Sequence, residues 1–253
     1  GRYRSRFCVC CGCMTQTIRN QAGPILARGR LVLEVEARAI RELVDRLDGE
    51  FERAVELVYA SGGRVITTGL GKSGIMCQKI ASTLTSTGTP SMFMHPVEAS
   101  HGDLGLFVPG DVIIAVSNSG ETDELVRLVP VLKRLAAPLV GIVGCPSSTL
   151  ACECDVVLDV SISEEACPLG LAPTASTTAA LAMGDALAMA LVDRRGFSAE
   201  QFAERHPGGM LGKRFLRVRE LMHGGARVPR VGERTSVREA VVEMTSKGFG
   251  ATS

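Results

Sequence analysis

A short polar loop, Ser117 to Thr122, follows an apolar segment and precedes a helical pattern. Four of its side chains, those of Ser117, Asn118, Ser119 and Thr122, can donate hydrogen bonds. A helix N-terminus adds free backbone amides and the positive end of the helix dipole, and both favour an anion. Ser and Asn are also ordinary helix caps, but one cap needs only one such residue. The loop therefore predicts a phosphate-binding site contacted by these four residues.

A glycine-rich loop, Gly69 to Gly74, follows another apolar segment and allows several interpretations. It is not a nucleotide P-loop, because Ile66 stands where that motif needs its first glycine. It satisfies the dinucleotide pattern G-x-G-x-x-G, but the acidic residue expected about 20 residues on is missing. As a sugar-phosphate site it would offer Gly71, the charge of Lys72 and the hydroxyl of Ser73. A plain strand-to-helix turn capped by Ser73 is the alternative.

Short apolar segments alternate with helical patterns along most of the chain. Strands are expected over residues 64–68, 91–94, 111–116, 139–143 and 156–160, and helices over 25–60 with an interruption at Gly49, 74–86, 120–135 and 176–193. This alternation indicates crossover connections and a parallel sheet, and the lack of polar alternation indicates that both sheet faces are covered. We predict a three-layer α/β/α sandwich with a five-stranded parallel sheet. Both polar loops follow strands, so both should face one crevice at the carboxyl edge of that sheet.

The composition argues against several classes of partner. The 253 residues carry a net charge of +1, contain no Trp and are only 4% aromatic, which disfavours nucleic-acid and membrane-surface binding. The most apolar stretch, Leu171 to Val192, contains Asp185 and is expected to be a buried core helix. Five of the nine cysteines are scattered among apolar residues, as is typical of a reduced protein. We expect a cytoplasmic protein.

The two ends of the chain differ in composition from its middle. The cluster Cys8, Cys10, Cys11 and Cys13 lacks the pair-loop-pair spacing of a folded zinc site. We expect residues 1–13 to be a non-native or disordered extension that precedes a natural start at Met14. Residues 14–215 form the expected α/β domain. Residues 216–253 are expected to be a linker and the start of another module, too short to bury a core of its own.

Several blocks together resemble the D-arabinose-5-phosphate isomerases of the sugar isomerase (SIS) domain family. They are Gly71–Gly74, Ser86–Pro90, His95–Asp103, Ser117–Thr122, Glu165–Leu169, Leu171–Thr178 and His206–Gly209, within a match from about Val32 to His223. Members of that family continue into two CBS modules, so the resemblance implies that residues 216–253 are a partial first CBS module. The chain departs from the family pattern at Ile75, where a histidine is frequent.

The resemblance implies the interconversion of D-arabinose 5-phosphate and D-ribulose 5-phosphate through a cis-enediol. It also implies a small-molecule sugar phosphate as ligand, no required cofactor and a homotetramer with shared active sites. Such a reaction needs a base, an acid for the ring oxygen and stabilisation of the enediolate charge. The sequence leaves open whether the activity would serve lipopolysaccharide sugar synthesis or another route.

Four residues are candidates for this chemistry. Glu165 is expected to transfer the proton, because apolar surroundings raise the pKa of a carboxylate; alternatively it is a surface acid beside Glu164. His206 is expected to open the sugar ring, in its own or a neighbouring subunit's site. Lys72 would neutralise charge on the substrate. Glu124 is expected to be a second acid or base, or else a solvated helix acid.

Further residues of the matching blocks complete the expected site. The resemblance places His101, Thr174 and Ser176 among the substrate-binding residues. His95 and His101 could hold an inhibitory zinc ion, since imidazoles are common zinc ligands. Two other functions stay open from the sequence: a non-catalytic SIS sensor that binds a sugar phosphate, and an NAD-dependent enzyme. The sensor is disfavoured because the sequence shows no helix-turn-helix segment before the sheet.

Overall fold

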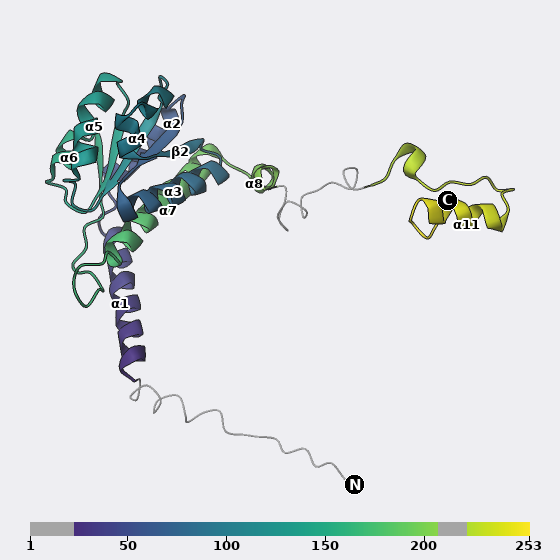
Figure 1. The fold of residues 1–253 in the computed structure, drawn as a ribbon, viewed down its shortest axis with the longest axis horizontal. Coiled ribbons are helices and arrows are strands. Elements are labelled where there is room, and N and C mark those ends of the chain that lie inside the picture. The colour runs from purple at the N-terminus through teal and green to yellow at the C-terminus, as the bar shows by residue number, and fades with distance from the viewer. Residues whose placement is uncertain (1–22, 207–221) are drawn as a thin grey trace, which may run out of the picture. The chain divides into compact units, whose positions relative to one another are not determined.

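The computed structural model describes residues 23–206 and 222–253. They belong to two compact units (Figure 1). The first unit ends at Phe197 and the second begins at Ser198, and each is described by itself. The expected extension at residues 1–13 and the expected domain boundary at residues 215–216 lie outside the described residues.

The first unit is an α/β domain built from five strands and the helices between them. Its elements are α1 (Pro24–Val44), α2 (Gly49–Ala60), β1 (Val65–Thr68), α3 (Gly71–Ser86), β2 (Ser91–Met94), α4 (Pro96–Ser100), β3 (Val112–Ser117), α5 (Asp123–Arg134), β4 (Leu139–Val143), α6 (Thr149–Glu153), β5 (Val156–Asp159) and α7 (Ala175–Arg195). All strand pairs are parallel, and the sheet order is β2-β1-β3-β4-β5. The predicted five-stranded parallel sheet is confirmed.

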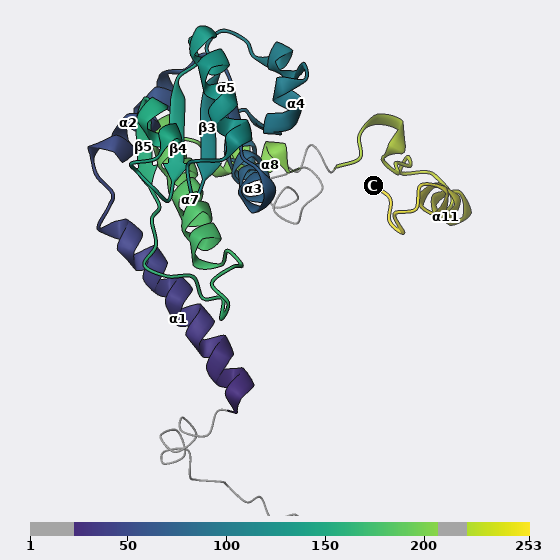
Figure 2. The same cartoon turned by 60° about the vertical axis from the view of Figure 1, so that its left-hand side comes forward.

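Helices cover both faces of the sheet, so that the sheet is the middle one of three layers (Figures 1 and 2). Successive side chains of a strand point to opposite faces, so each apolar strand supplies two cores. Val65, Ile114 and Ile142 pack with α2, α3 and α7 on one face. Ile66 and Ile113 pack with α4, α5 and α6 on the other face. This double burial explains why the strands show apolar runs without polar alternation.

The strand order reverses at the centre of the sheet. From β1 the chain passes through α3 to the edge strand β2, and it then returns to β3 on the other side of β1. The connection after β1 enters α3 on one face, whereas the connection after β3 enters α5 on the opposite face. The two loops therefore diverge at the carboxyl ends of neighbouring strands, which is where ligands bind in sheets of this kind.

Helix α7 is the central helix of its layer. Among the described helices, it alone has the length and apolar composition that crossing a membrane would require. Its residues Ala179, Met183, Leu187 and Leu191 are instead buried against the sheet and neighbouring helices. The expected core helix is therefore confirmed.

Helix α1 is only partly packed against the sandwich. Its Val35 and Ala39 pack with Ala166 and Ala175, which flank the start of α7. Its first half extends beyond the sheet in both views (Figures 1 and 2). In that half, Ile25, Leu26 and Leu33 are 86%, 60% and 68% exposed.

The second unit contains α8 (Ala199–Arg205) and, after the undescribed residues, α11 (Val237–Ser246). A capping box between Ser236 and Glu239 starts α11. Within the described residues, α11 has no buried side chain, in line with a segment too short to form a core.

Candidate functional site

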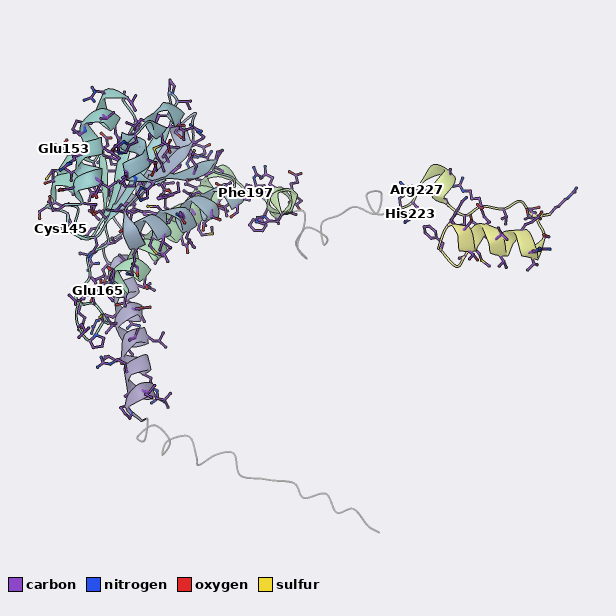
Figure 3. All side chains as sticks on the ribbon, viewed as in Figure 1. Cys145, Glu153, Glu165, Phe197, His223 and Arg227 are labelled. Atoms are coloured by element: carbon purple, nitrogen blue, oxygen red, sulfur yellow. The ribbon has the colours of Figure 1, made fainter. Side chains whose placement is uncertain are left out.

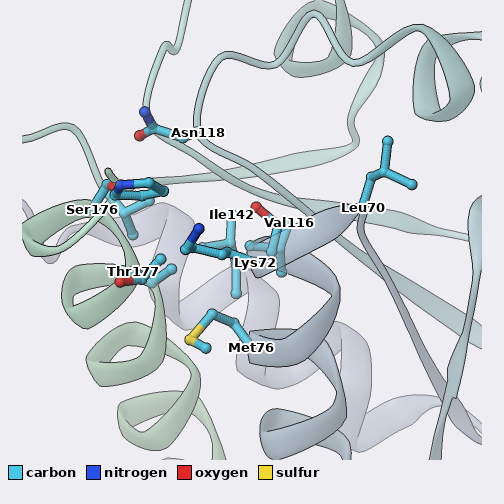
Figure 4. A pocket seen from close by; sticks show the side chains of 12 residues that line it. Leu70, Lys72, Met76, Val116, Asn118, Ile142, Ser176 and Thr177 are labelled. Carbon is cyan, nitrogen blue, oxygen red and sulfur yellow. The ribbon is translucent and has the colours of Figure 1, made fainter. Parts of the chain in front are cut away.

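A cavity of about 280 Å³ opens between α3 and α7 at the carboxyl edge of the sheet (Figure 4). Its apolar floor is formed by side chains of the central strands, and its polar lining comes from three separate parts of the chain: Lys72, Ser73, Asn118, Ser176 and Thr177. The glycine loop and the serine loop thus face one cavity, as expected. The start of α7 supplies its third side.

Lys72 enters the cavity because the chain turns sharply from β1 into α3. Gly71 adopts φ +58°, a left-handed conformation that favours glycine. A Cβ atom on Gly74 would lie 2.7 Å from the carbonyl oxygen of Gly69, so the turn requires glycine there as well. The N-cap of α3 is Leu70, not Ser73, and it forms no side-chain cap. The alternative of Ser73 as a helix cap is therefore wrong, and the Ser73 side chain lines the cavity.

The serine loop uses part of its polar groups to hold its own shape. The Ser117 hydroxyl is buried, accepts a hydrogen bond from the Gly120 amide at 3.0 Å and lies 3.0 Å from the Thr122 hydroxyl. The Ser119 hydroxyl accepts from the Glu121 amide at 3.2 Å. Of the predicted phosphate-contacting side chains in this loop, that of Asn118 lines the cavity. The structure thus gives Ser117 a shaping role that the sequence did not indicate.

The serine loop is also held from outside, by a short helix that sequence reasoning missed. A Glu121 carboxylate oxygen accepts from the Thr149 amide of α6 at 2.7 Å, and this hydrogen bond lowers the pKa of Glu121. Gly120 has φ +66°, and a Cβ atom there would lie 1.9 Å from the Ser148 hydroxyl. The glycine is thus the sequence signal that could have revealed the close approach of α6.

Glu165 is not a lining residue, but it lies at the N-terminus of α7 and is hydrogen-bonded to Ser176, which lines the cavity. One carboxylate oxygen accepts from the Thr174 amide at 2.7 Å and from the Thr174 hydroxyl at 2.9 Å. The other oxygen accepts from the Ser176 hydroxyl. Burial raises the pKa of Glu165, but these hydrogen bonds outweigh it, and the net effect lowers the pKa below its ordinary value. The expected raised pKa is therefore wrong, because the surroundings that looked apolar in sequence supply several donors.

The loop that carries Glu165 is anchored to α1 (Figure 3). The Arg38 guanidinium of α1 pairs with Glu164, and Arg46 donates to the Ser161 carbonyl oxygen at 2.6 Å. The Ala166 amide donates to the Thr174 hydroxyl at 2.9 Å and closes the loop on itself. Glu164, with a side chain 57% exposed, is the surface acid of this pair. Glu165 is the carboxylate turned toward α7.

The expected zinc site is not assembled. His95 and His101 stand at opposite ends of α4, as its N-cap and C-cap. His95 uses its Nδ1 atom to accept a hydrogen bond from the Val97 amide at 3.3 Å. In the part of the chain that the structure describes, no three His, Cys, Asp or Glu residues come together to hold a metal ion. His101, also expected to bind substrate, is exposed and lies outside the cavity lining.

Glu124, an expected catalytic residue, also lies outside the cavity lining. Glu124 is half-buried in the first turn of α5. His206 belongs to the second unit, where it ends α8. Its ring stacks on Phe202 with 4.0 Å between ring centroids, and its Nδ1 lies 2.8 Å from the Phe202 carbonyl oxygen. Their catalytic roles stay predictions.

The fold and the cavity define an α/β domain with a polar cavity at the switch point of a parallel sheet, which is the usual place for a ligand in such sheets. The SIS domain family matches residues 58–190, which is more than half of the chain. The chain therefore belongs to the SIS domain family.

Relatives within this family are similar over most of their length. Arabinose 5-phosphate isomerase KdsD of Escherichia coli strain K12 is 52% identical over 225 residues, covering 88% of this chain and 69% of the relative. The Pseudomonas aeruginosa protein of the same name is 52% identical over 219 residues, covering 86% and 67%. A solved structure of an Escherichia coli CFT073 protein in complex with arabinose 5-phosphate is 39% identical with a TM-score of 0.70, covering 72% of this chain and 97% of that one.

Proposed function

We propose that this chain is an aldose–ketose isomerase that interconverts D-arabinose 5-phosphate and D-ribulose 5-phosphate. The observation that carries the proposal is the shared cavity, in which Lys72 and the two loops lie opposite Ser176. The Ser176 hydroxyl in turn donates a hydrogen bond to Glu165. Similarity to enzymes named arabinose 5-phosphate isomerase supports the choice of substrate. It also favours an enzyme over the sensor alternative.

In this proposal the phosphate occupies the end of the cavity beneath the serine loop. Asn118 and Ser73 would donate hydrogen bonds, and Lys72 would supply a positive charge. Ser117, Ser119 and Thr122 would contribute through the shape of the loop and through amides at the start of α5. Neutral donors dominate this set, which suits a phosphate that must leave after each turnover.

The sugar carbons would extend from the phosphate toward α7 and Glu165. A lowered pKa keeps the Glu165 carboxylate ionised near neutral pH, so it is ready to accept a proton. It would take the proton from C2 of the open-chain aldose, the C–H electron pair would form the C1–C2 double bond, and the C1 carbonyl oxygen would gain a proton to give the enediol. Loss of the O2 proton would then form the C2 carbonyl as a proton returns to C1, giving the ketose. His206 would open the ring, with Glu124 as a second acid or base. No metal or redox cofactor is part of this scheme.

The proposed assembly is a homotetramer of a cytoplasmic protein. Ile25, Leu26 and Leu33 of α1 are exposed and apolar, and a partner subunit would cover them. Because α1 also contacts the loop of Glu165, assembly would stabilise the site. The resemblance of residues 216–253 to a partial CBS module is part of the same proposal.

An assay of the purified chain tests the function. D-arabinose 5-phosphate is mixed with the protein without added cofactor, and D-ribulose 5-phosphate is measured, alongside a panel of pentose and hexose phosphates. We expect conversion of the arabinose compound. A folded protein that is stabilised thermally by D-arabinose 5-phosphate but produces no ketose would contradict the proposal and support the sensor.

A further inference from the structure

The Ser176 hydroxyl joins Glu165 to the lining of the cavity by a hydrogen bond. Ser176 lines the cavity with Lys72 and Thr177, whereas Glu165 is absent from the lining (Figure 4). Ser176 is only 4% exposed, and its hydroxyl donates to a carboxylate oxygen of Glu165. A hydroxyl that donates to a carboxylate has committed its single proton, so it has none left to donate to a bound sugar.

Thr174 holds the other oxygen of the same carboxylate. Its amide and its hydroxyl both donate to that oxygen, and the Ser176 amide approaches it at 3.4 Å. The Thr174 hydroxyl in turn accepts from the Ala166 amide at 2.9 Å. Because its one donor and one of its two acceptor positions are used inside the protein, the Thr174 hydroxyl is part of the frame around Glu165.

Among the described residues, the other neighbours of Glu165 are an apolar cluster and an ion pair. Ala166 and Ala175 pack with Val35 of α1 in an apolar cluster beside the carboxylate. Glu164, the charged residue next to Glu165 in the loop, pairs with Arg38 of α1. The titratable thiol of Cys167 has its pKa lowered by backbone amides of its own loop, first that of Ala172.

We propose that Thr174 and Ser176 are positioning residues that orient and charge-stabilise Glu165, and that neither is a substrate ligand. This inference rests on the proposed isomerase function and deepens it. The pair holds the carboxylate in one orientation at the N-terminus of α7, where the helix dipole also favours a negative charge. Losing either hydroxyl removes a hydrogen bond that stabilises the charged form of Glu165 more than the neutral form.

Kinetics of matched variants test the inference in the full chain. Ser176→Ala and Thr174→Val are expected to lower kcat about tenfold each, with KM changed less than about threefold. The acidic limb of the kcat profile should move up by about one pH unit, since the charged carboxylate loses support. Ser176→Thr and Thr174→Ser keep a hydroxyl and should restore most of both properties. Thr178→Ala, which removes a hydroxyl elsewhere on α7, is the control and should behave like the wild type.

A measurement that needs no turnover separates this inference from the proposed function. The Glu165 side-chain carboxyl is followed by ¹³C NMR through a pH titration, with the signal assigned by its loss in Glu165→Gln. A raised midpoint in Ser176→Ala or Thr174→Val supports the inference, even if no pentose phosphate is converted. Unchanged midpoints would overturn it, as would a rise in KM with an unchanged kcat profile, because that pattern belongs to a substrate ligand.

Discussion

Glu165 is half-buried and accepts several hydrogen bonds, which lower its pKa and keep the carboxylate ionised near neutral pH. Glu165→Gln should lower kcat at least about a thousandfold, because an amide cannot accept the proton. Binding of the sugar phosphate should persist, since Ser176 can turn its hydroxyl to accept from the new amide group. Turnover assays and ligand-induced thermal stabilisation measure the two effects separately. A variant with wild-type rates would remove Glu165 from its assigned role.

Lys72 reaches from α3 toward the α7 side of the cavity (Figure 4). Lys72→Met should raise the KM for a sugar phosphate about tenfold or more, because a charge-assisted contact with the ligand is lost. Lys79→Met is the matched control on the same helix, where the ammonium group pairs with Asp185 of α7. Steady-state kinetics should show a change of less than about twofold for this control. Equal effects of the two substitutions would argue against a ligand contact by Lys72.

At the scale of elements, the serine loop depends on its fit against α6. Gly120→Ala would force a side chain into a left-handed conformation and onto the Ser148 hydroxyl. The conformational strain alone costs about 1–3 kcal/mol of unfolding free energy. We expect weaker sugar-phosphate binding together with a lower melting temperature. Gly105→Ala, at a position with open space, should leave both nearly unchanged.

The sheet could be predicted from the sequence because its strands are short runs of apolar residues followed by glycine or serine loops. The position of the cavity could be predicted as well, because the two loops follow neighbouring strands. Helices α4 and α6 were missed because five residues are too few to show a helical period. The support of Glu121 by α6, and that of Glu165 by Thr174, depends on tertiary contacts that no local pattern contains.

The expectation for Glu165 failed for a related physical reason. Apart from Glu164, its neighbours in sequence are apolar or small, which suggested a raised pKa. The deciding donors are a backbone amide and two hydroxyls that α7 brings back to the carboxylate. Composition indicates burial, but it does not indicate whether a buried charge is satisfied by hydrogen bonds.

For the whole molecule, one buried charge makes stability depend on pH. Asp111 is 1% exposed and accepts from the Arg64 amide at 2.7 Å and the Arg64 guanidinium at 2.8 Å. Burial raises the pKa of Asp111, but these hydrogen bonds outweigh it and lower the pKa overall. Its contribution to the free energy of unfolding is therefore present above the ordinary Asp value of about 3.9 and is lost as pH falls through the lower folded value.

Urea unfolding between pH 7 and pH 3 checks this contribution. Asp111→Asn should lose about 3 kcal/mol of unfolding free energy at neutral pH, because Arg64 is left without its partner. The difference from the wild type should shrink toward the acidic end. Asp103→Asn, at an exposed turn, should follow the wild-type curve. A constant difference across the range would contradict the assignment.

Self-association is the second property of the whole molecule that the structure makes testable. Leu33 of α1 is 68% exposed, and Leu33→Glu should lower the mass measured by light scattering if copies of the chain pack on this helix. Val237 of α11 is 81% exposed, and Val237→Glu is the matched control that should keep the wild-type mass. A monomeric wild-type chain would contradict the proposed tetramer.

The sheet order has one further consequence, which concerns how long a substrate can be. The serine loop follows β3 and the loop of Glu165 follows β5, and one strand, β4, lies between them. Neighbouring strands are about 4.8 Å apart, so the backbone sets these two loops roughly 10 Å apart across the sheet. Under the proposed function, this spacing would set the number of atoms that a substrate can carry between its phosphate and its reacting carbons. The stereochemistry at each carbon would then be read by the side chains between the two loops.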